Sequence, residues 1–329
     1  MKISRILLWA GLAALLLACL MTFSCSAHDP LAPMVSQAGD AAVPAPRAPV
    51  AAADEEGAVL WFRYGEEPLL APETRKISTS PTEPYEMSLL RALLNGPAAA
   101  STELRGLFPA GTQVLSTTRQ GRMLFVTLSG EIMNACPDEP ADWAREARWR
   151  TEAPLRRTLA MQAIAATITE NCDVDAVIIL VEQQQVTDSL RLRAKYYLQG
   201  GDELAEPLTR DESLLLTPVT AMETILQCWQ ERDWPRLYRY LSRKDVSGSA
   251  ARPDDEQLIA RLEALPHLTA YTVSGGHVSG QHATLTVQAQ LMQNSRMTGL
   301  DSAIFRLHCE DGVWRISVSQ LEHREEAAP

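Results

Sequence analysis

The chain has 329 residues, of which 46% are hydrophobic, and its formal net charge is −11. A negative surplus of this size argues against binding to nucleic acid and against lying flat on an anionic lipid surface, because both would repel it. The residues from position 58 onward are numerous enough for two domains of ordinary size.

The N-terminus has the pattern of a secretory signal. Lys2 and Arg5 precede an almost unbroken apolar run from Ile6 to Leu20, and the chain turns polar at Ser24. A basic start, a short apolar core and a small-residue boundary together predict a signal peptide over residues 1–24. An uncleaved anchor helix is the alternative, although the run is marginal for a membrane span of ~20 residues.

Two cysteines near the end of this run fit a lipidation pattern. Cys25 follows Thr22–Ser24 and precedes small residues, whereas Cys19 follows Leu16–Ala18 but precedes further apolar residues. Both segments resemble the triplet that precedes the lipidated cysteine of bacterial lipoproteins. We expect Cys25 to carry the lipid, with Cys19 as the alternative. Either choice predicts a protein anchored to the cytoplasmic membrane on its extracytoplasmic face.

Residues 25–57 change sharply in composition. Alanine and proline dominate the segment, and three acidic residues lie near its end, Asp54, Glu55 and Glu56. Such a sequence cannot bury a core and is stiffened by its prolines, so we expect a disordered tether that lifts the folded part off the membrane.

The first folded domain is expected over residues 58–210, and its pattern is that of an α+β fold. Period-two and apolar runs predict strands, and apolar residues at helical spacing predict helices. The elements in order are strand 58–64, helix 86–94, strands 113–118 and 123–128, helix 155–169 and strand 176–181. A loop carrying Pro72 is expected after the first strand. Gly96 and Pro97 are expected to end the first helix, because glycine can take the left-handed conformation and proline cannot continue a helix. The order β-α-β-β-α-β predicts a ferredoxin-like arrangement with two helices on one face of a small sheet.

Short motifs in this domain resemble the GerM domain family. They occur in the family's order, at Leu70–Arg75, Leu89–Pro97, Leu107–Thr112, Leu124–Ile132 and Asp175–Val181. The resemblance implies an exported lipoprotein of spore-forming or related bacteria that assembles with other envelope proteins and has no known catalytic residues. A lone pair such as Glu73 and Arg75 is accordingly interpreted as structural. The charged stretch with Trp143 and Trp149 is longer than is usual in the family.

That stretch offers the one guess at a partner contact. Trp and Arg favour the centres of protein interfaces, so Trp143 and Trp149 are candidate partner-contact residues. The alternative is a helix that packs against its own domain.

The second folded domain is expected over residues 217–323. Thr217 and Pro218 predict the start of a helix, because a hydroxyl caps it and proline suits its first turn. Further helices are expected at 233–241 and 254–265, and strands at 268–278, 283–291, 302–309 and 313–321. Three helices before a curved antiparallel sheet, with Gly312, Trp314 and Ile316 in the last strand, are similar to NTF2-like domains.

No catalytic constellation is recognisable in either domain. His282 and His308 fall on the polar faces of their strands, away from an apolar interior, and are interpreted as surface histidines. No phosphate-binding loop, zinc-protease motif or serine-hydrolase elbow is found, and we expect neither a metal nor another cofactor. Disulfides within each domain are possible for Cys136 with Cys172 and for Cys228 with Cys309, but free thiols are the expectation.

The sequence therefore predicts a non-catalytic binding or assembly module of the cell envelope, possibly in sporulation or germination. Its expected partners are the membrane, through the lipid, and one or more envelope proteins, with an oligomer possible. A ligand receptor that uses the pocket of the second domain is the first alternative. An envelope hydrolase with dispersed catalytic residues is the second.

Overall fold

The computed structural model describes residues 57–79, 82–183, 186–243, 255–322 and 325–326. The predicted signal, Cys19, Cys25 and the tether up to residue 56 lie outside these ranges. Of the helices in the described ranges, none combines the length and hydropathy needed to cross a lipid bilayer.

The first sheet is built on β1 (Ala58–Tyr64), which pairs antiparallel with β2 (Leu70–Arg75) and with β3 (Leu104–Arg105). The expectation of a loop around Pro72 was wrong, because this proline lies within β2 opposite Trp61. Since β2 is an edge strand, the missing N–H of Pro72 breaks no ladder on its outer side.

The second sheet has the order β4-β5-β6-β7. Its strands are β4 (Val114–Gln120), β5 (Met123–Leu128), β6 (Ala176–Gln183) and β7 (Val186–Arg191). The β5–β6 pair is parallel and the others are antiparallel. The apolar run at 176–181 occupies the middle of a sheet, as its sequence predicts. The α+β class is confirmed, with the strands divided between two sheets and with β2, β3 and β7 added to the predicted order.

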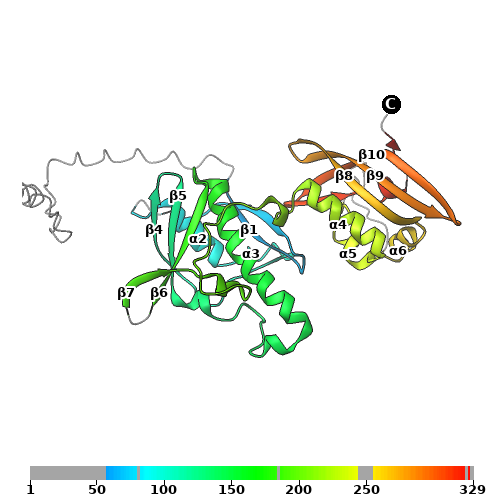
Figure 1. Cartoon of the computed structure of the whole chain (residues 1–329). Helices are drawn as coiled ribbons and strands as arrows, with labels where there is room; N and C mark the ends of the chain where they lie inside the picture. The colour runs from blue at the N-terminus through cyan, green and yellow to red at the C-terminus, as the bar shows by residue number, and fades with distance from the viewer. Residues whose placement is uncertain (1–56, 80–81, 184–185, 244–254, 323–324, 327–329) are drawn as a thin grey trace, which may run out of the picture. The chain divides into compact units, whose positions relative to one another are not determined.

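A long helix, α3 (Ala147–Asn171), connects the parallel strands and lies along the first sheet (Figure 1). Its side chains complete the hydrogen bonding of the β1 backbone. Trp61 N–H donates to Thr167 Oγ1 at 3.1 Å, and the Asn171 amide both accepts from Val59 N–H at 3.0 Å and donates to Val59 C=O at 2.7 Å. Polar groups of β1 that would otherwise be buried without partners are thereby satisfied.

The start of α3 differs from the prediction. The helix was expected from residue 155, where the Ala-rich, broadly apolar stretch begins. It begins at Ala147 instead, and Pro154 lies inside it. The two added turns make contacts that are described with the candidate site.

The helix α2 (Tyr85–Leu94) ends as the sequence predicts. Gly96 takes a φ of 86° and donates its N–H to Leu93 C=O. The motif pair on β2 secures this end: Arg75 donates to Ala92 C=O and Gly96 C=O, and Glu73 accepts from Ala98 N–H at 2.9 Å. Glu73 and Arg75 also form an ion pair at 3.1 Å, so the motif residues hold a helix terminus.

The second domain opens with α4 (Pro218–Glu231), α5 (Trp234–Tyr238) and α6 (Asp255–Glu263). Thr217 and Thr220 form a capping box at the start of α4, and Asp233 caps α5. The antiparallel sheet has the order β11-β10-β9-β8, with its helices on one face (Figure 1). Its strands are β8 (His267–Ser279), β9 (His282–Gln293), β10 (Arg296–Glu310) and β11 (Val313–Ile316), and β12 (Glu325–Glu326) pairs with β10.

The last predicted strand was too long. The expected run 313–321 ends as β11 at Ile316, and α7 (Val318–Glu322) follows it. Leu321 is fully buried on this short helix. Its apolar side chain was assigned to a strand, but a helical turn places it in the core. Short 3-10 helices complete the chain at Gly130–Met133, Trp143–Arg145, Ala194–Tyr197 and Glu212–Leu214.

Both predicted domains belong to one compact unit, and charged side chains connect them. The Glu67 side chain is 2% exposed and accepts hydrogen bonds from Arg236 and Arg239 in the second domain. Because an isolated buried carboxylate would be costly, two guanidinium partners are what make its burial tolerable.

Candidate partner-binding site

The strongest candidate site is the N-terminal end of α3 with the segment that precedes it, which we call the Trp/Arg segment (residues 141–151). Most of its side chains are exposed, and Trp143 and Trp149 are half-buried. The fully buried face of α3 starts only at Ala153. The first part of this helix therefore has little apolar contact to hold it, and polar contacts take over that role.

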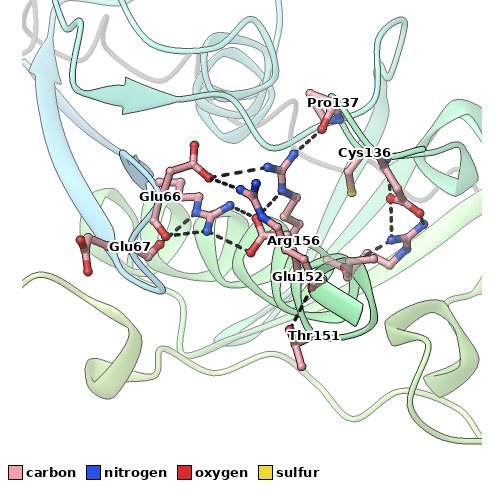
Figure 2. Close-up of polar contacts among 12 residues, drawn as sticks. Glu66, Glu67, Cys136, Pro137, Thr151, Glu152 and Arg156 are labelled. Atoms are coloured by element: carbon pink, nitrogen blue, oxygen red, sulfur yellow. Dashed lines mark hydrogen bonds and ion pairs between the residues drawn. The ribbon is translucent and has the colours of Figure 1, made fainter. Parts of the chain in front are cut away.

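One cluster of charges fixes the helix to the first sheet (Figure 2). Arg63 on β1 is 3% exposed and forms a two-pronged ion pair with Glu152 on α3. The remaining donors of Arg63 reach the main-chain oxygens of Glu66 and Glu67 at 2.8 and 2.9 Å. Glu152 also accepts from Arg156 Nε at 2.7 Å. This carboxylate thus connects two guanidinium groups that come from different elements.

The ionised form of Glu152 is favoured in this cluster. Burial of the carboxyl opposes ionisation, but the hydrogen bonds from Arg63 and Arg156 outweigh it and hold the pKa of Glu152 below its usual value. The pair is consequently charged at neutral pH, and removal of Glu152 would leave the buried guanidinium of Arg63 without a carboxylate partner.

A second ion pair pins the chain that leads into the segment. Arg157 donates to both oxygens of Glu139 at 2.8 and 2.9 Å, and the Glu139 side chain is 2% exposed. The same carboxylate accepts from Cys136 N–H at 3.0 Å, and Arg156 donates to Pro137 C=O (Figure 2). Both ends of the Trp/Arg segment are therefore attached to the body of the domain.

The two tryptophans occupy different positions in this arrangement. The Trp149 ring packs on the Arg156 guanidinium, with 4.7 Å between the guanidinium carbon and the ring centroid. Such a contact is worth about 0.5–1 kcal/mol at a partly exposed site. Trp143 lies in the 3-10 helix Trp143–Arg145, directly before α3. Trp149 thus contacts its own domain, as the alternative of a helix packed against that domain would require. The side chains around it remain exposed to solvent.

The exposed charges of the segment are mixed and sum to a formal charge of +1, since three arginines stand against Asp142 and Glu146. Arg145, Arg148 and Arg150 are exposed, and Arg148 forms an ion pair with exposed Glu66 at 3.5 Å. In a protein of net charge −11, this segment gathers three exposed arginines and two half-buried indole rings. Chemically it suits an acidic protein surface, because guanidinium groups bind carboxylates and arginine and tryptophan are enriched at interface centres.

The interior of the second domain has a different character. The side chains that face inward from β9 and β10 are apolar and at most 6% exposed: Ala283, Leu285, Val287, Ala289, Leu291, Ala303, Phe305 and Leu307. They belong to a core cluster that includes residues of α4 and α6. Acid, base or ligand-binding side chains are not found on this face within the described strands.

Histidine and cysteine positions follow the same division. His282 is exposed and His308 half-buried on the opposite, polar face of the sheet, as predicted. Cys136, Cys172, Cys228 and Cys309 are free thiols, so the possible disulfides are not formed in this structure. Across the described residues, no group of three or more potential metal ligands is found.

Comparison with known proteins finds a family match within the first domain. Residues 59–187 match the Germane family model, which is described as sporulation and spore germination. The GerM-like resemblance predicted from the motifs is thereby confirmed for this part of the chain. Curated proteins yielded no significant match to the chain.

Solved structures resemble each domain in turn. The first GerMN domain of the sporulation protein GerM from Bacillus subtilis is 16% identical, covers 46% of this chain and 96% of its own, and has a TM-score of 0.31. A putative lipoprotein from Clostridium perfringens is 23% identical, covers 47% and 87%, and has a TM-score of 0.27. An NTF2-like protein of unknown function from Shewanella oneidensis is 14% identical, covers 30% and 90%, and has a TM-score of 0.24.

Sequence reasoning found the tryptophans but missed the residues that hold them. The spacing of Glu152 and Arg156, four residues apart, is a signal for a helical ion pair that begins before Pro154. Nothing in the sequence links either residue to Arg63, which lies 89 positions before Glu152. That relationship depends on α3 lying along β1.

Proposed function

We propose that this protein is a non-catalytic assembly module of the cell envelope that acts in sporulation or spore germination. The proposal is supported by the family match over residues 59–187 and by the apolar interior of the second domain. A role in joining proteins requires a rigid surface with groups that bind a partner, and it requires no catalytic residues.

The observation that carries the proposal is the braced Trp/Arg segment. Its exposed arginines lie at and just before the N-terminal end of α3. Two buried ion pairs, Arg63–Glu152 and Arg157–Glu139, attach this region to the rest of the domain. A pre-organised surface loses little conformational entropy on binding, which raises affinity for a given set of contacts. We propose that the partner is an envelope protein with an acidic patch.

Site-specific photo-crosslinking in the native host tests this directly. A photoreactive amino acid at position 150 lies in the Trp/Arg segment, and one at position 296 replaces an exposed arginine at the start of β10. A discrete adduct from position 150, absent from position 296, supports the proposal. No adduct from position 150, or the same adducts from both positions, would exclude a specific docking role for the segment.

The proposal also places the protein on the extracytoplasmic face of the membrane through a lipid on Cys25. The N-terminal pattern of residues 1–25 motivates this step. In cell fractionation, Cys25→Ala should move the protein out of the membrane fraction or leave an unprocessed precursor, whereas Cys19→Ala should be processed and retained normally. The reverse pattern would assign the lipid to Cys19, and normal processing with membrane retention in both variants would reject lipid anchoring.

A further inference from the structure

Two histidines face each other across neighbouring strands on the polar side of the second domain. His282 on β9 is the direct cross-strand partner of His308 on β10. Cys309 N–H donates to Gln281 C=O, so the adjacent His308–His282 pair lies at a non-hydrogen-bonded position of the ladder. Side chains approach each other most closely at such positions.

The two rings are close enough to bind the same ion. Their centroids are 4.6 Å apart and their planes are inclined by 42°. The two Nδ1 atoms are separated by 3.4 Å. This is long for a hydrogen bond between nitrogen atoms, for which about 3.0 Å is usual.

The same separation matches a pair of metal ligands. Zinc binds imidazole nitrogen at about 2.0–2.1 Å, and two nitrogens at those distances in tetrahedral directions lie about 3.4 Å apart. The backbone ladder places the two residues opposite each other and their Nδ1 atoms already lie 3.4 Å apart, so no rearrangement of the sheet is needed to bring the nitrogens together. Little ordering energy would therefore oppose binding.

The surroundings leave room for further ligands from solvent. Exposed Ser279 on β8 lies across from His282, and exposed Arg306 lies two residues before His308 on the same face. Arg315, opposite His308 on β11, is already paired with Glu103 at 2.7 Å and lies near Glu310. Its charge is thus partly neutralised before a cation arrives.

We propose that His282 and His308 form a two-histidine site for a divalent transition-metal ion, with water completing its coordination. Zinc and nickel are the chemical class that imidazole nitrogen suits. With two protein ligands the site is open and exchangeable, unlike a structural zinc site, which uses four. This inference is independent of the proposed assembly role.

Isothermal titration of the purified, untagged full chain with Zn²⁺ alone tests the site. The variants are His282→Asn and His308→Asn, and His267→Asn is the matched control because it changes an exposed histidine at the start of β8. His282 is exposed and His308 only half-buried, so the variants should fold like the parent, which circular dichroism verifies.

The parent and the His267→Asn control should bind about one equivalent with the same affinity, and each site variant should lose about tenfold or more. Loss of retention on immobilised nickel by the site variants alone would agree. An absence of Zn²⁺ binding to the parent, or unchanged affinity in either site variant, would overturn the proposal.

Discussion

Arg63 and Glu152 are separated by 89 positions in the sequence, yet they form the ion pair that fixes the start of α3 to the first sheet. Arg63 is 3% exposed and the Glu152 side chain 12%. The pair lies in the part of α3 before Ala153, where the helix has no buried apolar face. A polar contact therefore takes the place of hydrophobic packing there. It connects the fold to the surface that we propose as a docking site.

Replacing Glu152 by alanine should therefore destabilise the protein strongly. The change leaves the buried guanidinium of Arg63 without its carboxylate, and breaking a buried pair from one side costs about 3–5 kcal/mol. Chemical denaturation measures the loss. Glu263→Ala, at an exposed position on α6, should stay within about 0.5 kcal/mol of the parent. Equal effects of the two changes would show that the cluster does not brace the helix.

Acidification should remove the same contribution. The pKa of Glu152 is lowered in the folded protein, because the hydrogen bonds from Arg63 and Arg156 outweigh burial. A carboxyl of this kind stabilises the fold above its unfolded-state pKa of about 4.3, and the contribution is lost as pH falls through the folded value. The difference in unfolding free energy between the parent and Glu152→Gln should thus be largest near neutral pH and shrink below about pH 4.3. A constant difference down to about pH 3 would contradict this linkage.

A glycine in β8 should prove irreplaceable. An ideal Cβ on Gly276 would lie 2.0 Å from Thr284 O and 2.9 Å from Leu285 Cα, at the register shift between β8 and β9. Gly276→Ala should cost about 3 kcal/mol, at the upper end of overpacking changes. Gly299→Ala on β10 is the control, since nothing lies within 4 Å of its Cβ position. Thermal denaturation measures the melting temperatures of both variants. Equal melting temperatures would contradict the predicted clash at Gly276.

The buried thiols should be present but unreactive. Burial raises the pKa of Cys136 to about 11 and that of Cys228 to about 12, so both remain protonated at neutral pH. Maleimide should leave them unmodified in the folded protein and modify both after unfolding without reductant. Protection that persists after unfolding would instead reveal disulfides, and rapid labelling of the folded protein would contradict the burial.

Most helices and strands could be predicted from short-range patterns in the sequence. Thr217 and Pro218 signalled the start of α4, Gly96 signalled the end of α2, and the apolar run at 176–181 signalled a central strand. Pro72 misled because a proline on an edge strand is read in the same way as one in a loop.

What could not be predicted depends on contacts between distant elements. The extension of α3 before Pro154 rests on Arg63 and on the Glu139–Arg157 pair, which span 89 and 18 positions. The closeness of His282 to His308 rests on strand register, although their shared polar face was predicted. Lipidation at Cys25 and the identity of the partner stay predictions.

The central claim is that the arginines of the Trp/Arg segment bind an acidic envelope partner. We would compare affinity capture of the full chain from the native host with that of Arg145→Glu/Arg148→Glu/Arg150→Glu, which reverses the exposed charge of the segment. Arg296→Glu is the single-charge control on the second domain. The account predicts one discrete envelope protein that is captured by the parent and the control and lost with the triple variant. Capture of that protein undiminished by the triple variant would contradict it.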